Sequence, residues 1–156
     1  PTVMIDDDGQ AYMFWGNGSC KWVKLKENMM EVDGPITTFK PKNYIEGPWV
    51  YKRKDLYYLV YASAGTKPEM IEYCTSKSIE GPWEYRGIIQ ENVPNSFTTH
   101  PGILDYKGKS YFFYHNGVLP TGGSYRRSIC IDYMYYNEDG TIQKIVQTKE
   151  GVAAVK

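Results

Sequence analysis

Short apolar and aromatic runs alternate with clusters of Gly, Asp, Asn and Lys along the whole chain. Runs rich in Val, Ile, Tyr, Phe and Trp that are bounded by such turn residues are typical of β-strands. In three places one run, a tight polar turn and a second run follow each other, and each place predicts a β-hairpin. These hairpins occupy residues 2–16, 49–63 and 101–116, with turns near residues 8, 54 and 108, so the pattern repeats about every 50 residues.

A second, weaker pair of strands is expected after each hairpin. Four strands at a period of about 40–50 residues are typical of β-propeller blades. The runs AYMFWG, YYLVYAS and SYFFYHN are nearly all apolar, as expected of strands that pack on both faces between neighbouring blades, and no stretch keeps a helical period. The weaker pairs are CKWVKL with ITTF, MIEYCTS with WEYRGII, and RSICIDYMYY with GTIQKIVQ.

The pattern therefore predicts an all-β protein with three propeller blades, at about residues 1–42, 43–96 and 97–150. Three blades do not close a ring, because propellers have about four to eight. We expect the chain to be part of a larger propeller, since it also begins within two residues of a strand. Blade edges left exposed would favour self-association of residues 1–156.

Composition excludes several partners. Lys plus Arg equals Asp plus Glu, at 18 each, so no net field recruits nucleic acid or an acidic membrane surface. No apolar run approaches the roughly 18–20 residues that span a bilayer, and no signal peptide is visible. The three cysteines, Cys20, Cys74 and Cys130, are far apart and odd in number, which favours buried thiols over a disulfide framework.

The pentapeptide IEGPW occurs twice, at residues 45–49 and 79–83. The second copy follows a polar stretch and precedes a predicted outer strand, so Gly-Pro predicts a turn there and Glu80 a solvated carboxylate. The first copy immediately precedes the innermost strand of a blade, and inner strands begin beside the propeller axis. Apolar and aromatic neighbours of Glu46 would raise its carboxyl pKa, as a general acid requires. A second turn Glu is the alternative.

The order and spacing of these motifs resemble the catalytic domain of glycoside hydrolase family 43. The matching stretches are 1–3 leading to 6–12, 46–52, 57–61, 99–103, 107–111 and 127–130, which together cover essentially the whole chain. The resemblance implies blades three to five of a five-bladed ring. It also implies an exo-acting, inverting enzyme, secreted or periplasmic, that releases arabinofuranose or xylose from plant polysaccharide such as arabinoxylan.

The resemblance also assigns catalytic residues. Glu46 matches the general acid. The Asp that tunes this acid would stand immediately before Pro1, and the general base would lie roughly a hundred residues upstream, so residues 1–156 alone are expected to be inactive. Asp6, Asp7 and Asp8 fall in an outer hairpin turn of the family pattern and are interpreted as turn residues.

Three further positions are candidate sugar ligands. Thr66 matches a position at the sugar pocket, with a hairpin-end Thr as the alternative, and Arg127 matches an arginine whose forked donors suit sugar hydroxyls. His100 matches a histidine near the axis that binds calcium or its water shell in some members, with a structural His as the alternative. No cofactor is required beyond this candidate calcium. His115 has no match and is interpreted as end-of-strand packing. The alternative function is a carbohydrate-binding propeller without catalysis.

Overall fold

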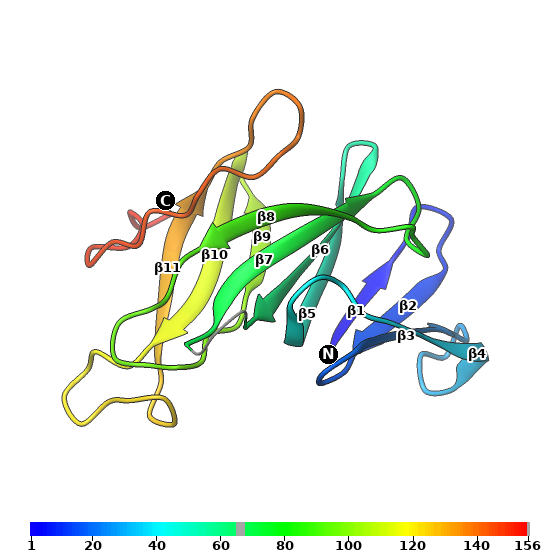
Figure 1. Ribbon diagram of the computed structural model, residues 1–156. Coiled ribbons are helices and arrows are strands. Elements are labelled where there is room, and N and C mark those ends of the chain that lie inside the picture. Colours follow the sequence, from blue (N-terminus) through cyan, green and yellow to red (C-terminus); the bar gives the residue numbers. More distant parts are fainter. Residues whose placement is uncertain (65–67, 156) are drawn as a thin grey trace.

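The computed structural model describes residues 1–64 and 68–155, and these form eleven strands in three antiparallel sheets, with no helix (Figure 1). The first sheet has the order β1-β2-β3-β4, the second β5-β6-β7-β8 and the third β11-β10-β9. The strands are β1 (Thr2–Ile5), β2 (Ala11–Trp15), β3 (Cys20–Leu25), β4 (Val32–Phe39), β5 (Tyr44–Arg53), β6 (Leu56–Ser63), β7 (Met70–Ser76), β8 (Glu84–Gln90), β9 (Gly102–Tyr106), β10 (Lys109–Asn116) and β11 (Ser128–Met134).

The prediction of an all-β protein with three propeller blades is confirmed. Each predicted hairpin is the first strand pair of its sheet, and the turns fall at Gly9, Lys54 and Gly108, all of which have positive φ. The sheets lie side by side and each meanders from one strand to its neighbour in sequence (Figure 1). The blade arrangement brings the starts of β5 and β9 and the β2–β3 turn to one region, where the site described below lies.

Strand β6 shows why the apolar pattern produces this packing. Successive side chains of a strand point to opposite faces. Tyr57, Leu59 and Tyr61 join the core shared with the first sheet, whereas Tyr58 and Val60 join the core shared with the third sheet. All of these residues are at most 6% exposed. The expectation that an almost wholly apolar strand packs on both faces is confirmed for β6.

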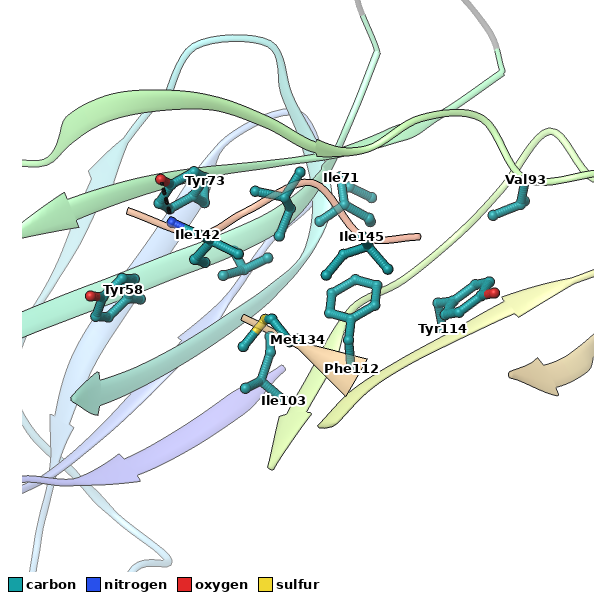
Figure 2. Packing of buried hydrophobic residues seen from close by; sticks show 13 residues of the cluster. Tyr58, Ile71, Tyr73, Val93, Ile103, Phe112, Tyr114, Met134, Ile142 and Ile145 are labelled. Atoms are coloured by element: carbon teal, nitrogen blue, oxygen red, sulfur yellow. Dashed lines mark hydrogen bonds between the residues drawn. The ribbon is translucent and has the colours of Figure 1, made fainter. Parts of the chain in front are cut away.

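The predicted fourth strand of the third sheet, at residues 140–147, is wrong. Only an isolated bridge joins Tyr136 to Ile142, and the segment turns toward the second sheet instead, where the Ile145 N–H donates to the Ile89 carbonyl (2.7 Å). The Ile142 N–H donates to the Tyr73 hydroxyl (3.0 Å). Figure 2 shows Ile142 and Ile145 pointing into the core between the two sheets. Burying these side chains there decides the path, because apolar burial outweighs one more strand pairing.

The remaining composition-based expectations concern thiols and membranes. Cys20, Cys74 and Cys130 are all free; the first two are buried, and Cys130 is only partly so. Burial raises the pKa of the Cys20 thiol to about 12, so it remains neutral. In the part of the chain that the structure describes, no helix could cross a membrane.

Candidate active site

The second copy of IEGPW is a structural turn. Residues 79–83 connect β7 to β8, and the Glu80 carboxylate is 44% exposed and pairs with Lys24 of β3 at 2.8 Å. The ion pair joins the outer part of the second sheet to the first sheet. The prediction of a surface carboxylate at this copy is confirmed.

The first copy has a different backbone. From the sequence it is expected to precede the innermost strand, but it lies inside that strand, β5. There the pairing with β6 shifts register on both sides of Glu46. Bulges of this kind bend a strand and re-aim a side chain, and they are common beside active sites. Gly47 adopts φ 63°, a conformation that other residues rarely adopt. The same five letters therefore give a turn at one place and a bulged strand at the other.

The Glu46 carboxylate lies where all three sheets meet. Asn17, in the β2–β3 turn, donates from Nδ2 to Glu46 Oε2 at 3.2 Å. His100, just before β9, has Nε2 at 3.4 Å from Glu46 Oε1, within ion-pair distance but not aligned as a hydrogen bond. The Glu46 side chain is 33% exposed, so a substrate can reach it. Sequence reasoning identified Glu46 and His100 but missed Asn17, which only the fold brings here.

The expectation of an apolar surround for Glu46 is wrong. The aromatic residues that follow it, Trp49 and Tyr51, pack into the core between the second and third sheets. The Tyr51 ring stacks on Tyr58 with centroids 4.8 Å apart. Because of the bulges in β5, the Glu46 side chain points away from its aromatic neighbours in sequence. Its carboxylate contacts the polar groups of Asn17 and His100 instead.

A second carboxylate, Glu69, stands beside Glu46. One ligand atom each from Glu46, Glu69 and His100 lies within 4.8 Å of the other two. Glu69 is only 7% exposed, and the Thr99 N–H donates to its Oε2 at 3.0 Å. Burial raises the pKa of Glu69, the nearby Glu46 carboxylate raises it further, and the Thr99 amide, His100 and Arg127 oppose the rise. Sequence reasoning missed Glu69, since one acid before an apolar strand carries no signal.

This second carboxylate is poorly placed to activate water. An inverting glycosidase needs its two carboxyl groups about 6.5–9.5 Å apart, so that a water fits beside the sugar. Glu46 and Glu69 have carboxylate oxygens within 4.8 Å, and Glu69 is buried. The pair therefore supplies one accessible acid rather than an acid and a base.

His115 packs against His100. The two rings are 5.7 Å apart in an edge-on arrangement, and His115 Nε2 lies 3.2 Å from the Thr98 hydroxyl. Burial, together with the charges of Arg127 and His100, lowers the pKa of His115 to about 4. His115 is thus a neutral packing residue, as interpreted from the sequence, but its place is under the site.

The low pKa of His115 makes stability depend on pH. An unfolded His titrates near 6.5 and His115 in the folded protein near 4, so between these values the unfolded chain binds more protons. The stabilisation is complete above about pH 6.5 and is lost as the pH falls toward 4. From about pH 7 to about pH 5 we expect this residue to remove roughly 2 kcal/mol from the free energy of unfolding. Denaturant titrations of the full-length protein and its His115→Gln variant at both pH values measure this loss of stability. If both proteins lost the same free energy of unfolding between the two pH values, the prediction would be contradicted.

Arg127 and Thr66 complete the set of predicted sugar ligands. Arg127 is exposed, and its Nε donates to the Ser124 carbonyl at 2.9 Å, which anchors the side chain. Its positive charge lowers the pKa of both Glu69 and His115. Thr66 lies outside the described residues. The candidate acids Asp6, Asp7 and Asp8 lie in or beside the β1–β2 turn, as predicted, and Asp7 pairs there with Lys52 at 2.7 Å.

A cation fits the cluster of Glu46, Glu69 and His100 if it keeps most of its water ligands. Two carboxylates and a His ring nitrogen are suitable donors, and His100 Nε2 is buried without a hydrogen-bond partner among the described residues. Calcium takes about 6–8 oxygen ligands, so three protein groups would leave most positions to water. Direct coordination by Glu46 would also occupy the carboxylate that an acid needs. The residues therefore suit a hydrated ion facing His100.

Gly47 supports His100 directly. A Cβ at this position would stand 3.2 Å from two ring atoms of His100, in addition to the strain of φ 63°. We expect Gly47→Ala to displace the ring from Glu46 and to lower kcat on the order of 10-fold or more, since small displacements near reacting groups are costly. Gly81→Ala in the other IEGPW copy is the matched control: it is strained too (φ 93°, Trp83 at 3.1 Å), but should lower only stability. Equal kcat values for the two variants would contradict this.

A hollow of about 280 Å³ lies at the opposite end of β5 and is lined by Arg53, Lys109 and three tyrosines, among others. Among the described residues, none that lines it is a carboxylate or histidine that could exchange a proton with a substrate. It therefore does not compete with the Glu46 region as a catalytic site.

Comparison with known proteins gives a consistent picture. The model of glycosyl hydrolases family 43 matches residues 1–142. A β-D-galactofuranosidase of Aspergillus niger is 32% identical over 96% of this chain and 46% of its own length. A xylosidase/arabinosidase of Bacteroides ovatus is 33% identical over 91% of this chain and 55% of its own length. The chain thus spans about half the length of these curated relatives.

Solved structures agree in fold. An α-L-arabinofuranosidase from Clostridium thermocellum superposes with a TM-score of 0.81 at 33% identity, over 95% of this chain and 52% of that one. A β-xylosidase/α-arabinofuranosidase from a compost metagenome, bound to xylotriose in a calcium-free form, gives 0.84 at 26% identity, over 92% of this chain and 56% of that one. Both likenesses extend over nearly all of the three sheets.

Proposed function

Because the chain belongs to glycoside hydrolase family 43, we propose that the protein containing it is an exo-acting, inverting glycosidase. It releases arabinofuranose or xylose from plant cell-wall polysaccharide such as arabinoxylan. The observation that carries the proposal is the Glu46 carboxylate, partly exposed where three sheets meet and contacted by Asn17 and His100. The names of the relatives, which include arabinofuranosidases and xylosidases, support the substrate class.

Glu46 acts as the general acid in this proposal. Its proton passes to the glycosidic oxygen as the bond to the anomeric carbon breaks, while a water attacks the opposite face of the sugar. Asn17 holds one carboxylate oxygen, which fixes the direction of the other toward the substrate. The base that activates the water lies outside residues 1–156, because Glu69 is too close to Glu46 and too buried for that role.

A direct consequence concerns the segment by itself. Residues 1–156 expressed alone are expected to hydrolyse aryl glycosides no faster than the same segment carrying Glu46→Gln, since an acid without a base leaves water unactivated. Release of the aryl alcohol measures both. A rate for the unmodified segment clearly above that of its variant would contradict the assignment of the base to another part of the protein.

The remaining roles are those of ligands. We propose that Arg127 donates to sugar hydroxyls, which its exposed, anchored guanidinium suits, and that Thr66 and His100 line the pocket. A calcium ion with its waters would sit against His100, where it would fix the local charge and geometry. The proposed substrate is a polymer of the cell wall, so we propose secretion or a periplasmic location.

The test is hydrolysis of an aryl α-L-arabinofuranoside and an aryl β-D-xyloside by the full-length protein. Turnover of either supports the proposal, and the preferred substrate names the activity. No turnover of either, with binding of xylo-oligosaccharide intact in calorimetry, would overturn it in favour of a carbohydrate-binding propeller.

A further inference from the structure

Glu69 has a buried carboxylate that takes no part in the proposed mechanism. It precedes β7 in the second sheet, yet its side chain reaches the segment that leads into β9 of the third sheet. A carboxylate that is 7% exposed is costly to place unless its interactions are specific. Its surroundings therefore indicate what it does.

Two hydrogen bonds join Glu69 to the segment before His100. The Glu69 N–H donates to the Phe97 carbonyl at 3.0 Å, and the Thr99 N–H donates to Glu69 Oε2 at 3.0 Å. Thr99 is fully buried, so its amide depends on this acceptor. The main chain of Glu69 is itself held, because Asn92 Nδ2 donates to its carbonyl at 3.2 Å. Glu69 thus holds residues 97–99 with two groups, its backbone N–H and its side-chain carboxylate.

The segment that Glu69 holds ends one residue before His100. The ring of His100 stands 3.4 Å from Glu46 and rests on Gly47, so a shift of the Thr99 backbone would move it relative to the acid. The Glu69 carboxylate also reaches within 4.8 Å of both groups. Glu46, His100 and Glu69 come from three separate segments. The two Glu69 hydrogen bonds, together with one from the Thr99 hydroxyl to Gln90 Oε1 in β8 (3.4 Å), tie the His100 segment to the sheet that carries Glu46.

We propose that Glu69 is a positioning residue for the acid: through the Thr99 amide it holds His100 in register with Glu46. The inference rests on the proposed function for its kinetic test. Glu72, three residues further on, offers a comparison. It is also buried, at 1% exposure, but its carboxylate accepts hydrogen bonds from Ser63 Oγ and Asn43 Nδ2 rather than from the Thr99 amide.

Two substitutions distinguish the effect of the hydrogen bond to the Thr99 amide from the effect of side-chain packing at position 69. Glu69→Gln keeps the length and an oxygen that accepts the Thr99 N–H, whereas Glu69→Met keeps the length and removes the acceptor. In the full-length protein, Gln should keep kcat within about 3-fold, and Met should lower it by about 10- to 100-fold with KM changed less than about 3-fold. If Met prevents folding, Glu69→Asp replaces it, because the shorter side chain withdraws the acceptor.

The leaving group gives a readout that simple destabilisation would not move. A dinitrophenyl glycoside needs little help from an acid, but an unsubstituted phenyl glycoside needs a well-placed one. The loss in Glu69→Met should therefore be large for the phenyl substrate and small for the dinitrophenyl substrate. Glu72→Gln, the matched buried control, should change both rates by the same factor. Equal losses on both substrates in Glu69→Met would overturn the proposal.

Crystal structures of the wild type and of the Glu69→Gln and Glu69→Met variants provide a readout without catalysis. We expect the His100–Glu46 separation to be kept in Glu69→Gln and lengthened in Glu69→Met. An unmoved His100 in Glu69→Met would overturn the positioning role even if activity falls. Conversely, a wild-type protein inactive on every glycoside would defeat the proposed function and leave the structural comparison to decide on Glu69.

Discussion

Glu46→Gln is expected to lower kcat for xylo-oligosaccharide or arabinoxylo-oligosaccharide hydrolysis on the order of 10²- to 10⁴-fold, the range of general acid catalysis. Gln has the same shape and keeps an oxygen for the Asn17 amide, so the site should stay folded. It has no proton to transfer to the glycosidic oxygen. Sugar release by the full-length protein and its variant, at saturating substrate, measures the effect.

The chain supplies its own control for this experiment. Glu80→Gln makes the same change in the same pentapeptide, but at a turn where the carboxylate pairs with Lys24. Loss of one exposed ion pair should leave both the stability and kcat nearly unchanged. A fall in kcat for Glu80→Gln comparable to that for Glu46→Gln would contradict the separation of the two copies.

Phe112→Ala should produce the largest loss of stability, about 3–5 kcal/mol in the free energy of unfolding. Phe112 is fully buried in β10, and Figure 2 shows its ring beside Met134 and Ile145 in the core that joins the second and third sheets. Truncation would leave a cavity that three separate segments surround, so none of them can close it alone. Denaturant titration of the full-length protein measures the change.

Met30→Ala is the control for side-chain size. Met30 is 85% exposed in the β3–β4 connection, so its truncation should change the free energy of unfolding by less than about 0.5 kcal/mol. Comparable losses for the two variants would show that the core between the sheets does not hold the fold together as described.

The fold was largely predictable, because strand signals are local. The apolar run at residues 56–63 and the turn residues at 8–9, 54 and 108 determine hairpins without reference to the rest of the chain. The segment 140–147 escaped prediction for the opposite reason. Its apolar residues Ile142 and Ile145 suit a strand as well as a segment laid over a neighbouring sheet, and only the shape of the core between two blades decides.

The site was predictable only in part. Glu46 stood out because a repeated pentapeptide allowed two contexts to be compared, and His100 through resemblance. Neither the bulges that turn Glu46 away from Trp49 nor the arrival of Asn17 and Glu69 left a sequence pattern, since each depends on long-range contacts. The expected apolar surround failed for this reason: neighbours in sequence were taken as neighbours in space.

The most direct test of the central claim, that Glu46 delivers the proton, compares two glycosides in the Glu46→Gln variant of the full-length protein. With an unsubstituted phenyl glycoside the leaving oxygen needs a proton, so we predict a loss on the order of 10²-fold or more relative to wild type. With a dinitrophenyl glycoside the leaving group departs as a stable anion, and we predict that most of the wild-type rate remains. Equal loss on both substrates would contradict the assignment and would make Glu46 a structural or binding residue.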